Sequence, residues 1–215
     1  MHTNDSFINF IIDHKVLTVS STPFTLASGQ KSHLYINWRS VTNNFFLFDK
    51  LLKMVLEFIQ LNNIHCDTFY GVPEGASKLA LFVQYFYLQK KYSSEESSSL
   101  ATLAMGRGVP KNHGSIADKY FIGQPIGDVI IIEDVTTTGE SLIKTIEIVK
   151  ELPNTKVIGC LVLTDRSHHG SKSMDDYFVK NNIKLYSLSN MDKIIQKINS
   201  NFPKLAEEIN LYEQQ

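Results

Sequence analysis

The sequence has only two cysteines, Cys66 and Cys160, and they lie far apart among apolar residues. Two distant cysteines provide neither a disulfide framework nor the paired spacing of a zinc site. A small thiol in apolar surroundings behaves as a core residue. We therefore expect both cysteines to be buried free thiols.

The sequence also lacks a long apolar run and an excess of charge of one sign. No stretch reaches the roughly 18 apolar residues that a membrane span needs. The opening segment, MHTNDSFINF, does not have the basic-then-apolar order of a signal peptide. The formal net charge is -1, so no global basic field attracts nucleic acid. These absences predict a cytoplasmic protein that acts without a membrane and without nucleic acid.

What is present is an ordinary globular composition, with 43% hydrophobic and 20% charged residues in a chain of 215. That length can bury a substantial core, so one domain over residues 1–215 is expected. We find no internal repeat and no linker.

Apolar periodicity divides the chain into helices and strands. Helices are expected over residues 5–15, 45–61, 76–89, 140–152 and 174–181, with two more near the C-terminus. Short strands are expected over residues 24–26 and 34–36 as a hairpin, and over 68–70, 100–105, 128–132, 157–163 and 184–188. Because strands and helices alternate, the pattern predicts an α/β fold with a parallel sheet flanked by helices.

Two segments lack periodicity. Residues 92–99 are polar, and residues 106–127 form a long stretch punctuated by glycine and proline, which is typical of a functional or mobile loop. Ligands of parallel sheets bind beyond the carboxyl ends of the strands. Residues 71–75, 133–139 and 164–170 are therefore expected on one rim.

The central rim segment, Ile130 to Ser141, reads IIIEDVTTTGES. A phosphate suits a strand-to-helix loop, because helix-start N–H groups are unpaired and glycine permits close approach. The preceding carboxylates suit hydroxyl donors, such as those of a ribose, or a cation. An equally good interpretation is that Thr137 or Thr138 merely caps the helix. The common nucleotide loops, G-x-x-x-x-G-K-[ST] and G-x-G-x-x-G between strand and helix, are absent.

An apolar strand followed by Glu-Asp-Val-x-Thr-Thr-Gly-x-Ser resembles the signature of the type I phosphoribosyltransferases. In that family the acidic pair holds the ribose hydroxyls of phosphoribosyl pyrophosphate, and the threonine loop holds its 5′-phosphate. The resemblance implies a type I phosphoribosyltransferase-like parallel sheet with a small N-terminal hood. The hood would comprise roughly residues 1–40 plus C-terminal segments, and the core roughly residues 44–190.

Further segments resemble the orotate phosphoribosyltransferases, and the likeness covers most of the chain. Residues 24–39 are similar to the family's hairpin, residues 107–114 (RGVPKNHG) to its mobile catalytic loop, and residues 164–170 (TDRSHHG) to its D-R-x-x-x-G. Residues 71–80 resemble its pyrophosphate segment. Taken separately, a plain hairpin and a solvated basic loop are the better explanations of the first two.

The resemblance implies transfer of a phosphoribosyl group to orotate in de novo pyrimidine biosynthesis, leading to UMP, with Mg²⁺ as cofactor. The residues expected to bind phosphoribosyl pyrophosphate are Glu74, Gly75, Arg107, Gly108, Lys111, His113, Glu133, Asp134, Val135, Thr136, Thr137, Thr138, Gly139, Glu140 and Ser141. Those expected to bind orotate are Tyr35, Ile36, Thr137 and Arg166. The catalytic candidates are Lys111, His113 and Asp134. No side chain is assigned as a direct metal ligand.

The resemblance further implies a homodimer in which the 106–127 loop acts on the partner's site. Three positions depart from the pattern, because Ala27, Gly75 and Gly108 stand where the family often has lysine. Glu133 also stands where the family often has aspartate. Lys31 or Lys78 could supply part of the missing charge. The alternatives left open are a phosphoribosyltransferase for another base and a non-catalytic ligand-binding protein of the same fold.

Overall fold

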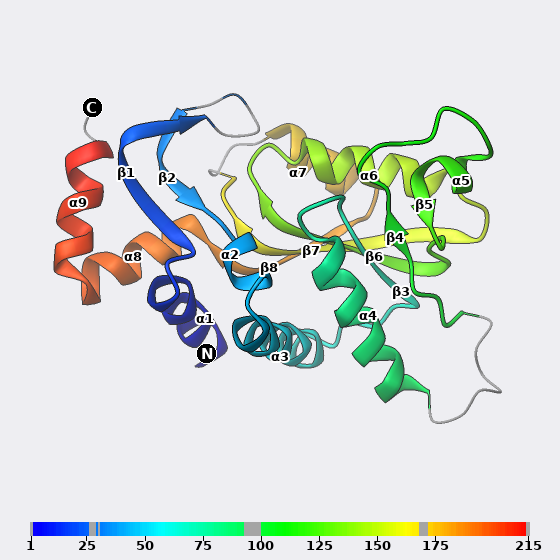
Figure 1. Cartoon of the computed structure of the whole chain (residues 1–215), viewed down its shortest axis with the longest axis horizontal. Coiled ribbons are helices and arrows are strands. Elements are labelled where there is room, and N and C mark those ends of the chain that lie inside the picture. Colours follow the sequence, from blue (N-terminus) through cyan, green and yellow to red (C-terminus); the bar gives the residue numbers. More distant parts are fainter. Residues whose placement is uncertain (1, 26–28, 30, 93–99, 168–171, 214–215) are drawn as a thin grey trace.

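The computed structural model describes residues 2–25, 29, 31–92, 100–167 and 172–213. Its centre is a parallel sheet whose strands lie in the order β3 (Thr68–Gly71), β6 (Gly127–Thr136), β7 (Thr155–Asp165) and β8 (Lys184–Asn190). The flanking helices are α3 (Phe45–Leu61), α4 (Ser77–Lys91), α6 (Glu140–Lys150) and α7 (Lys172–Lys180). The predicted α/β fold with a parallel sheet between helices is confirmed (Figure 1).

The sheet separates two hydrophobic cores because alternate residues of a strand face opposite sides. In β6, Ile130 and Ile132 pack with α3 and α4, whereas Val129 and Ile131 pack with α6 and α7. All four side chains are almost completely buried. This double burial accounts for the continuous apolar run in the sequence.

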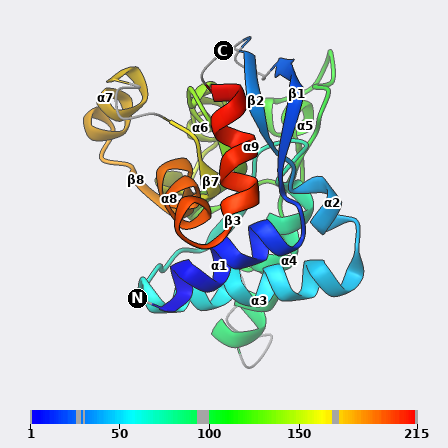
Figure 2. The ribbon, with the colours of Figure 1, turned by 90° about the vertical axis from the view of Figure 1, so that its left-hand side faces the viewer.

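A second group of elements forms a hood at one end of the molecule (Figures 1 and 2). The hood consists of α1 (His2–Asp13), the antiparallel pair β1 (Leu17–Thr25) and β2 (Lys31–Ile36), α8 (Met191–Asn201) and α9 (Pro203–Glu213). Helix α9 packs on both hairpin strands, so residues from the two ends of the chain build one unit. The predicted hairpin is confirmed, although its first strand begins earlier than expected.

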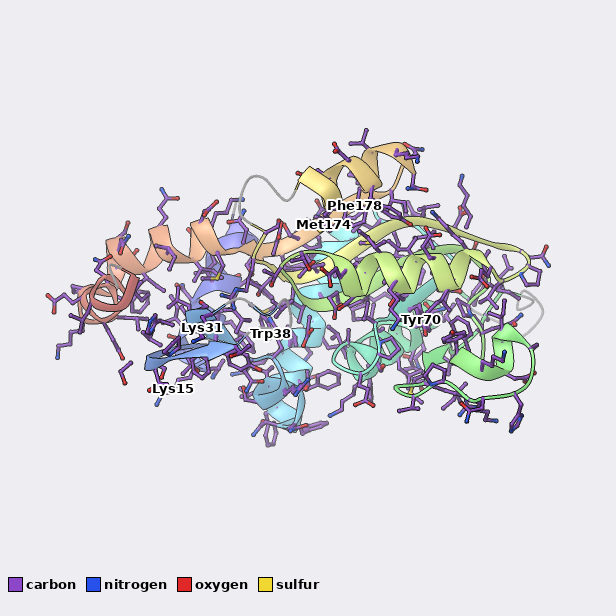
Figure 3. All side chains as sticks on the ribbon, turned by 90° about the horizontal axis from the view of Figure 1, so that it is seen from above. Lys15, Lys31, Trp38, Tyr70, Met174 and Phe178 are labelled. Carbon is purple, nitrogen blue, oxygen red and sulfur yellow. The ribbon has the colours of Figure 1, made fainter. Side chains whose placement is uncertain are left out.

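Trp38 fastens the hood to the sheet (Figure 3). Its indole is stacked against Phe7 of α1, with ring centroids 5.3 Å apart, and lies 6.4 Å from the ring of Phe10. The indole Nε1 donates a hydrogen bond to Thr164 Oγ1 in β7 at 3.1 Å. The short helix α2 (Arg39–Thr42) begins at the next residue.

Two predictions about the segment after α4 are wrong. Residues 100–105 do not form a strand, because only β4 (Met105–Gly106) finds a partner, the equally short β5 (Phe121–Ile122). The 106–127 stretch also contains the helix α5 (Ile116–Tyr120), which opens with a capping box between Ser115 and Asp118. We call residues 105–122 the flap.

The remaining expectations about burial agree with the structure. Cys66 and Cys160 are buried free thiols, and burial raises the pKa of each. Within the part of the chain that the structure describes, no helix combines the length and the apolarity needed to cross a membrane.

Candidate active site

A cavity of about 310 Å³ opens at the carboxyl ends of β3, β6 and β7, between the sheet and the hood. It brings together most of the predicted segments. The predicted site residues that line it are Tyr35, Ile36, Glu74, Gly75, Glu133, Asp134, Val135, Thr137, Ser141 and Arg166. Segments that are far apart in the sequence therefore share one cavity, as the strand-end rule predicts.

The acidic pair at the end of β6 lies in the floor of this cavity. Glu133 is 5% exposed, and Asp134 beside it is half-buried. Burial, together with the charge of Asp134, raises the pKa of Glu133 to about 9. At neutral pH Glu133 is therefore protonated and can donate as well as accept a hydrogen bond.

The raised pKa makes a prediction about stability. Glutamate in an unfolded chain titrates near pH 4.3, so between about pH 4.3 and 9 the folded protein holds a proton that the unfolded chain has lost. The contribution of Glu133 to the free energy of unfolding is therefore fully present below about pH 4.3. It decreases as the pH rises toward 9, by up to about 1.4 kcal/mol per pH unit. In urea unfolding between pH 5 and 8, the free energy of unfolding of Glu133→Gln should change less with pH than that of wild type. The exposed Glu57→Gln variant should keep the wild-type slope, and identical slopes for Glu133→Gln and wild type would contradict the assignment.

The threonine loop joins β6 to α6, and no side chain caps the helix. The N-cap position is Gly139, with φ of +79°, and neither threonine of the cap interpretation fills that role. Thr137 lines the cavity, while the Thr136 hydroxyl lies beneath the loop against Met174 Sδ at 3.8 Å. The loop therefore offers helix-start N–H groups and the Thr137 and Ser141 side chains, which is the arrangement that binds a phosphate.

Arg166 lines the cavity next to the hood. It follows β7, is 9% exposed, and its Nη2 donates to Ser32 Oγ of β2 at 3.2 Å. Burial lowers the pKa of its guanidinium, which still stays charged at neutral pH. Tyr35 and Ile36 of β2 line the same wall. Residues His168 to Gly170, the last part of the predicted segment 164–170, lie outside the described residues.

Gly75 and Gly108 stand where the family often has lysine, and in the structure both positions leave no room for a side chain. A Cβ at Gly75 would lie 2.9 Å from Asp134 Oδ2, and a Cβ at Gly108 would lie 2.7 Å from Glu74 Cδ. In both places an acidic side chain of the site fills the room that a lysine stem would need. Ala27, the third departure, lies outside the described residues.

The flap lies beside the cavity. Arg107 and Gly108 border a neighbouring cavity that shares Val72, Pro73 and Ser141 with the first. The flap is held by its own hydrogen bonds, including Arg107 Nε to Asp118 O at 3.2 Å. Two of the predicted catalytic residues, Lys111 and His113, are exposed and do not line the cavity of their own chain.

The structure adds cavity residues that sequence reasoning missed. They are Thr25, Asn37, Trp38, Arg39, Val72 and Pro73. Arg39 is the most notable chemically, because it adds a second guanidinium to the cavity. The pattern of residues 24–39 predicts a hairpin, but nothing in it indicates that its last residue, Arg39, lines the cavity.

The chain has the fold of the type I phosphoribosyltransferases, and its sequence is similar to those of orotate phosphoribosyltransferases. Its relatives in sequence include the orotate phosphoribosyltransferases of Sulfurisphaera tokodaii, 27% identical over 81% of this chain and 80% of the relative, and of Pyrococcus abyssi, 29% identical over 86% and 91%. The crystal structure of orotate phosphoribosyltransferase from Francisella tularensis superposes with a TM-score of 0.69 at 20% identity, covering 100% of this chain and 97% of that one. No protein-family model matches the chain.

Proposed function

We infer that the chain is an orotate phosphoribosyltransferase, a pentosyltransferase that converts orotate and phosphoribosyl pyrophosphate into orotidine 5′-phosphate and pyrophosphate. This reaction belongs to de novo pyrimidine biosynthesis. One observation carries the inference: a single cavity contains an acidic pair, an uncapped helix start and a buried arginine on a hairpin wall. These three groups match a ribose, a phosphate and a planar anionic base.

The proposed binding mode assigns one part of the substrates to each group. Glu133 and Asp134 hold the ribose hydroxyls, and the loop from Thr136 to Ser141 holds the 5′-phosphate. Arg166 pairs with the carbonyls and carboxylate of orotate, because a planar guanidinium fits such an edge. The orotate ring then lies along Tyr35 and Ile36.

The chemistry exchanges two bonds at the anomeric carbon. The bond from C1′ to the pyrophosphate oxygen breaks, and pyrophosphate leaves with the electron pair. Orotate N1, having lost its proton, forms the new bond from the opposite face with inversion. The protein contributes alignment and electrostatic stabilisation, so no covalent nucleophile is needed. We propose that Lys111 and His113 neutralise the leaving group, and that His113 can protonate it.

Mg²⁺ fits this site as a partner of the substrate. The side-chain oxygens of Asp134 would provide the hard donors that Mg²⁺ prefers, directly or through water, and the protonated Glu133 could donate a hydrogen bond to a bound water. Among the described residues, no three His, Cys, Asp or Glu side chains gather as a metal site, so most ligands would come from substrate and water. When bound, the ion would offset the negative charge of the pyrophosphate.

The decisive test mixes purified protein with orotate, phosphoribosyl pyrophosphate and Mg²⁺ and follows the absorbance of orotate. We expect orotate to be consumed and pyrophosphate to appear in equal amounts. A panel with adenine, guanine, hypoxanthine and uracil tests the base. If a base other than orotate reacts preferentially, the substrate assignment is wrong. If ligands bind in calorimetry without any turnover, the protein is not an enzyme of this kind.

We also propose that the protein is a homodimer in which the flap completes the partner's site. Lys111 and His113 do not line the cavity of their own chain. Exposed aromatic side chains lie on α3 and α4, the helix that follows the pyrophosphate segment, including Phe45 at 76% and Phe46 at 74% exposure. Val109 in the flap is 82% exposed. A pairing that covers these surfaces would place each flap near the other chain's cavity.

Mixing two inactive variants tests the shared site. Arg166→Ala removes the base contact and Lys111→Ala removes a flap cation, so each homodimer should be inactive. If the flap acts in trans, a mixed dimer has one intact site, and exchange should restore up to about a quarter of wild-type activity. Exchange is verified by tagging one variant. An exchanged mixture with no recovered activity would contradict the proposal.

A further inference from the structure

Apart from the flap residues proposed to act from the partner chain, the charges around the cavity leave the pyrophosphate group of the substrate without an evident cation. The described lining residues carry three carboxyl groups, from Glu74, Glu133 and Asp134, and two guanidinium groups, from Arg39 and Arg166. Arg166 is directed to the hood through Ser32. A substrate with a pyrophosphate group needs a further positive charge away from Arg166, next to Glu74 and Gly75.

Neither lysine suggested by the sequence provides that charge. Lys78 Nζ donates to Thr42 O at 3.0 Å and to Asn43 Oδ1 at 3.3 Å, so its ammonium is committed to the end of α2. Among the described residues that line the cavity, neither Lys31 nor Lys78 is found. Gly75 itself has no room for a side chain unless Asp134 moves.

Resting on the proposed function, we propose that Arg39 binds the pyrophosphate group of phosphoribosyl pyrophosphate and stabilises it as it leaves. Arg39 is the first residue of α2, its side chain is exposed, and it lines the cavity together with Glu74 and Gly75. A guanidinium matches two phosphate oxygens with two parallel N–H donors.

The position of Arg39 is fixed at both ends of its short helix. On one side Trp38 is 1% exposed and is held by stacking on Phe7 and by its hydrogen bond to Thr164. At the other end Lys78, in the first turn of α4, holds Thr42 and Asn43. Helix α4 follows directly after the pyrophosphate segment, so this second tether places α2 beside residues 72–75.

The same contacts give Lys78 a different role from Arg39. Lys78 acts on the backbone of α2 and positions the arginine, whereas Arg39 is the group that meets the substrate. The backbone N–H of Arg39 also donates to Asn37 Oδ1 at 3.1 Å, which turns the chain at the cavity wall. A cation placed in this way remains beside the leaving group whether or not the flap is closed.

The test compares Arg39→Ala, Arg39→Gln and Arg39→Lys with a matched control, Lys53→Ala, which removes an exposed cation paired with Asp49 on α3. Calorimetry with Mg²⁺ and pyrophosphate should show affinity weakened about 10- to 100-fold in the alanine and glutamine variants. The lysine variant should recover part of it, and the control should match wild type. In turnover, KM for phosphoribosyl pyrophosphate should rise by a similar factor while KM for orotate changes by less than about twofold.

The two proposals fail in different ways. Unchanged pyrophosphate affinity in both Arg39→Ala and Arg39→Gln overturns the role of Arg39, even if the wild type is a fully active orotate enzyme. An equal rise in KM for orotate and for phosphoribosyl pyrophosphate also overturns it, since it indicates a general disturbance. If the Arg39 variants bind pyrophosphate more weakly than wild type but the wild-type protein never consumes orotate, the role of Arg39 is supported and the substrate assignment is refuted.

Discussion

Replacing Arg166 with alanine is expected to lower kcat/KM for orotate by about 1,000-fold. The guanidinium is 9% exposed, and its one described side-chain hydrogen bond is to Ser32. Its other donors are available to the carbonyls and carboxylate of the base. Removing one partner from a buried, charged hydrogen-bonded pair costs about 2–5 kcal/mol, which corresponds to the expected loss. Steady-state kinetics with orotate as the varied substrate measure it.

The matched variant is Arg166→Lys, which keeps the charge and loses the planar fork. It should stay at least about 100-fold below wild type, because an ammonium cannot make two parallel hydrogen bonds to one edge. Binding of pyrophosphate should be unchanged in both variants, which separates the base side of the cavity from the Arg39 side. Full activity of Arg166→Lys would show that the site requires only a positive charge there.

Replacing Gly139 with alanine is expected to destabilise the protein by about 3 kcal/mol and to raise KM for phosphoribosyl pyrophosphate at least about 10-fold. An L residue with φ of +79° costs about 1–2 kcal/mol. In addition, the new Cβ would lie 2.6 Å from Met174 Cγ, in a close-packed core where overpacking costs about 1–3 kcal/mol. Met174 projects from α7 beneath the loop (Figure 3). We expect relief of this overlap to move the loop that we propose binds the phosphate.

The control for stability is Gly29→Ala. Gly29 has an almost identical φ of +80°, but no atom of the described residues lies within 4 Å of the position of a Cβ. Urea unfolding should therefore show only the backbone cost, about 1–2 kcal/mol. Equal losses for the two variants would show that Met174 does not constrain the loop. Phosphoribosyl pyrophosphate binding by Gly139→Ala at wild-type affinity would show that the loop can shift without consequence.

Most of the fold could be predicted from the sequence because its long elements have strong periodicity. The helix predicted at residues 45–61 has those bounds in the structure, and the buried run of β6 identified the centre of the sheet. The flap was missed because its strands have two residues each and its helix has five, which is too short for periodicity to appear. The Ser115–Asp118 capping box was the one local signal that could have revealed α5.

The site was predictable to the extent that it follows strand ends. Asp134 lies near the end of β6, and Thr137 and Arg166 directly follow β6 and β7, so one topological rule places them on one rim. Arg39 follows no such rule. Its approach to the cavity depends on the packing of Trp38 and on the tether from Lys78 to α2, two contacts between distant parts of the sequence. Such contacts leave no local pattern in a single sequence.

The way in which the hood is assembled has a consequence for the nascent chain. The strands of the central sheet, together with the acidic pair and the threonine loop, are complete once residue 190 has emerged from the ribosome. The wall that receives the base, however, rests on α9, which packs on both hairpin strands and spans Pro203–Glu213. A growing chain therefore completes the residues that we propose to bind phosphate and ribose before it completes the proposed wall for orotate, and selectivity for the base would be the last property to mature.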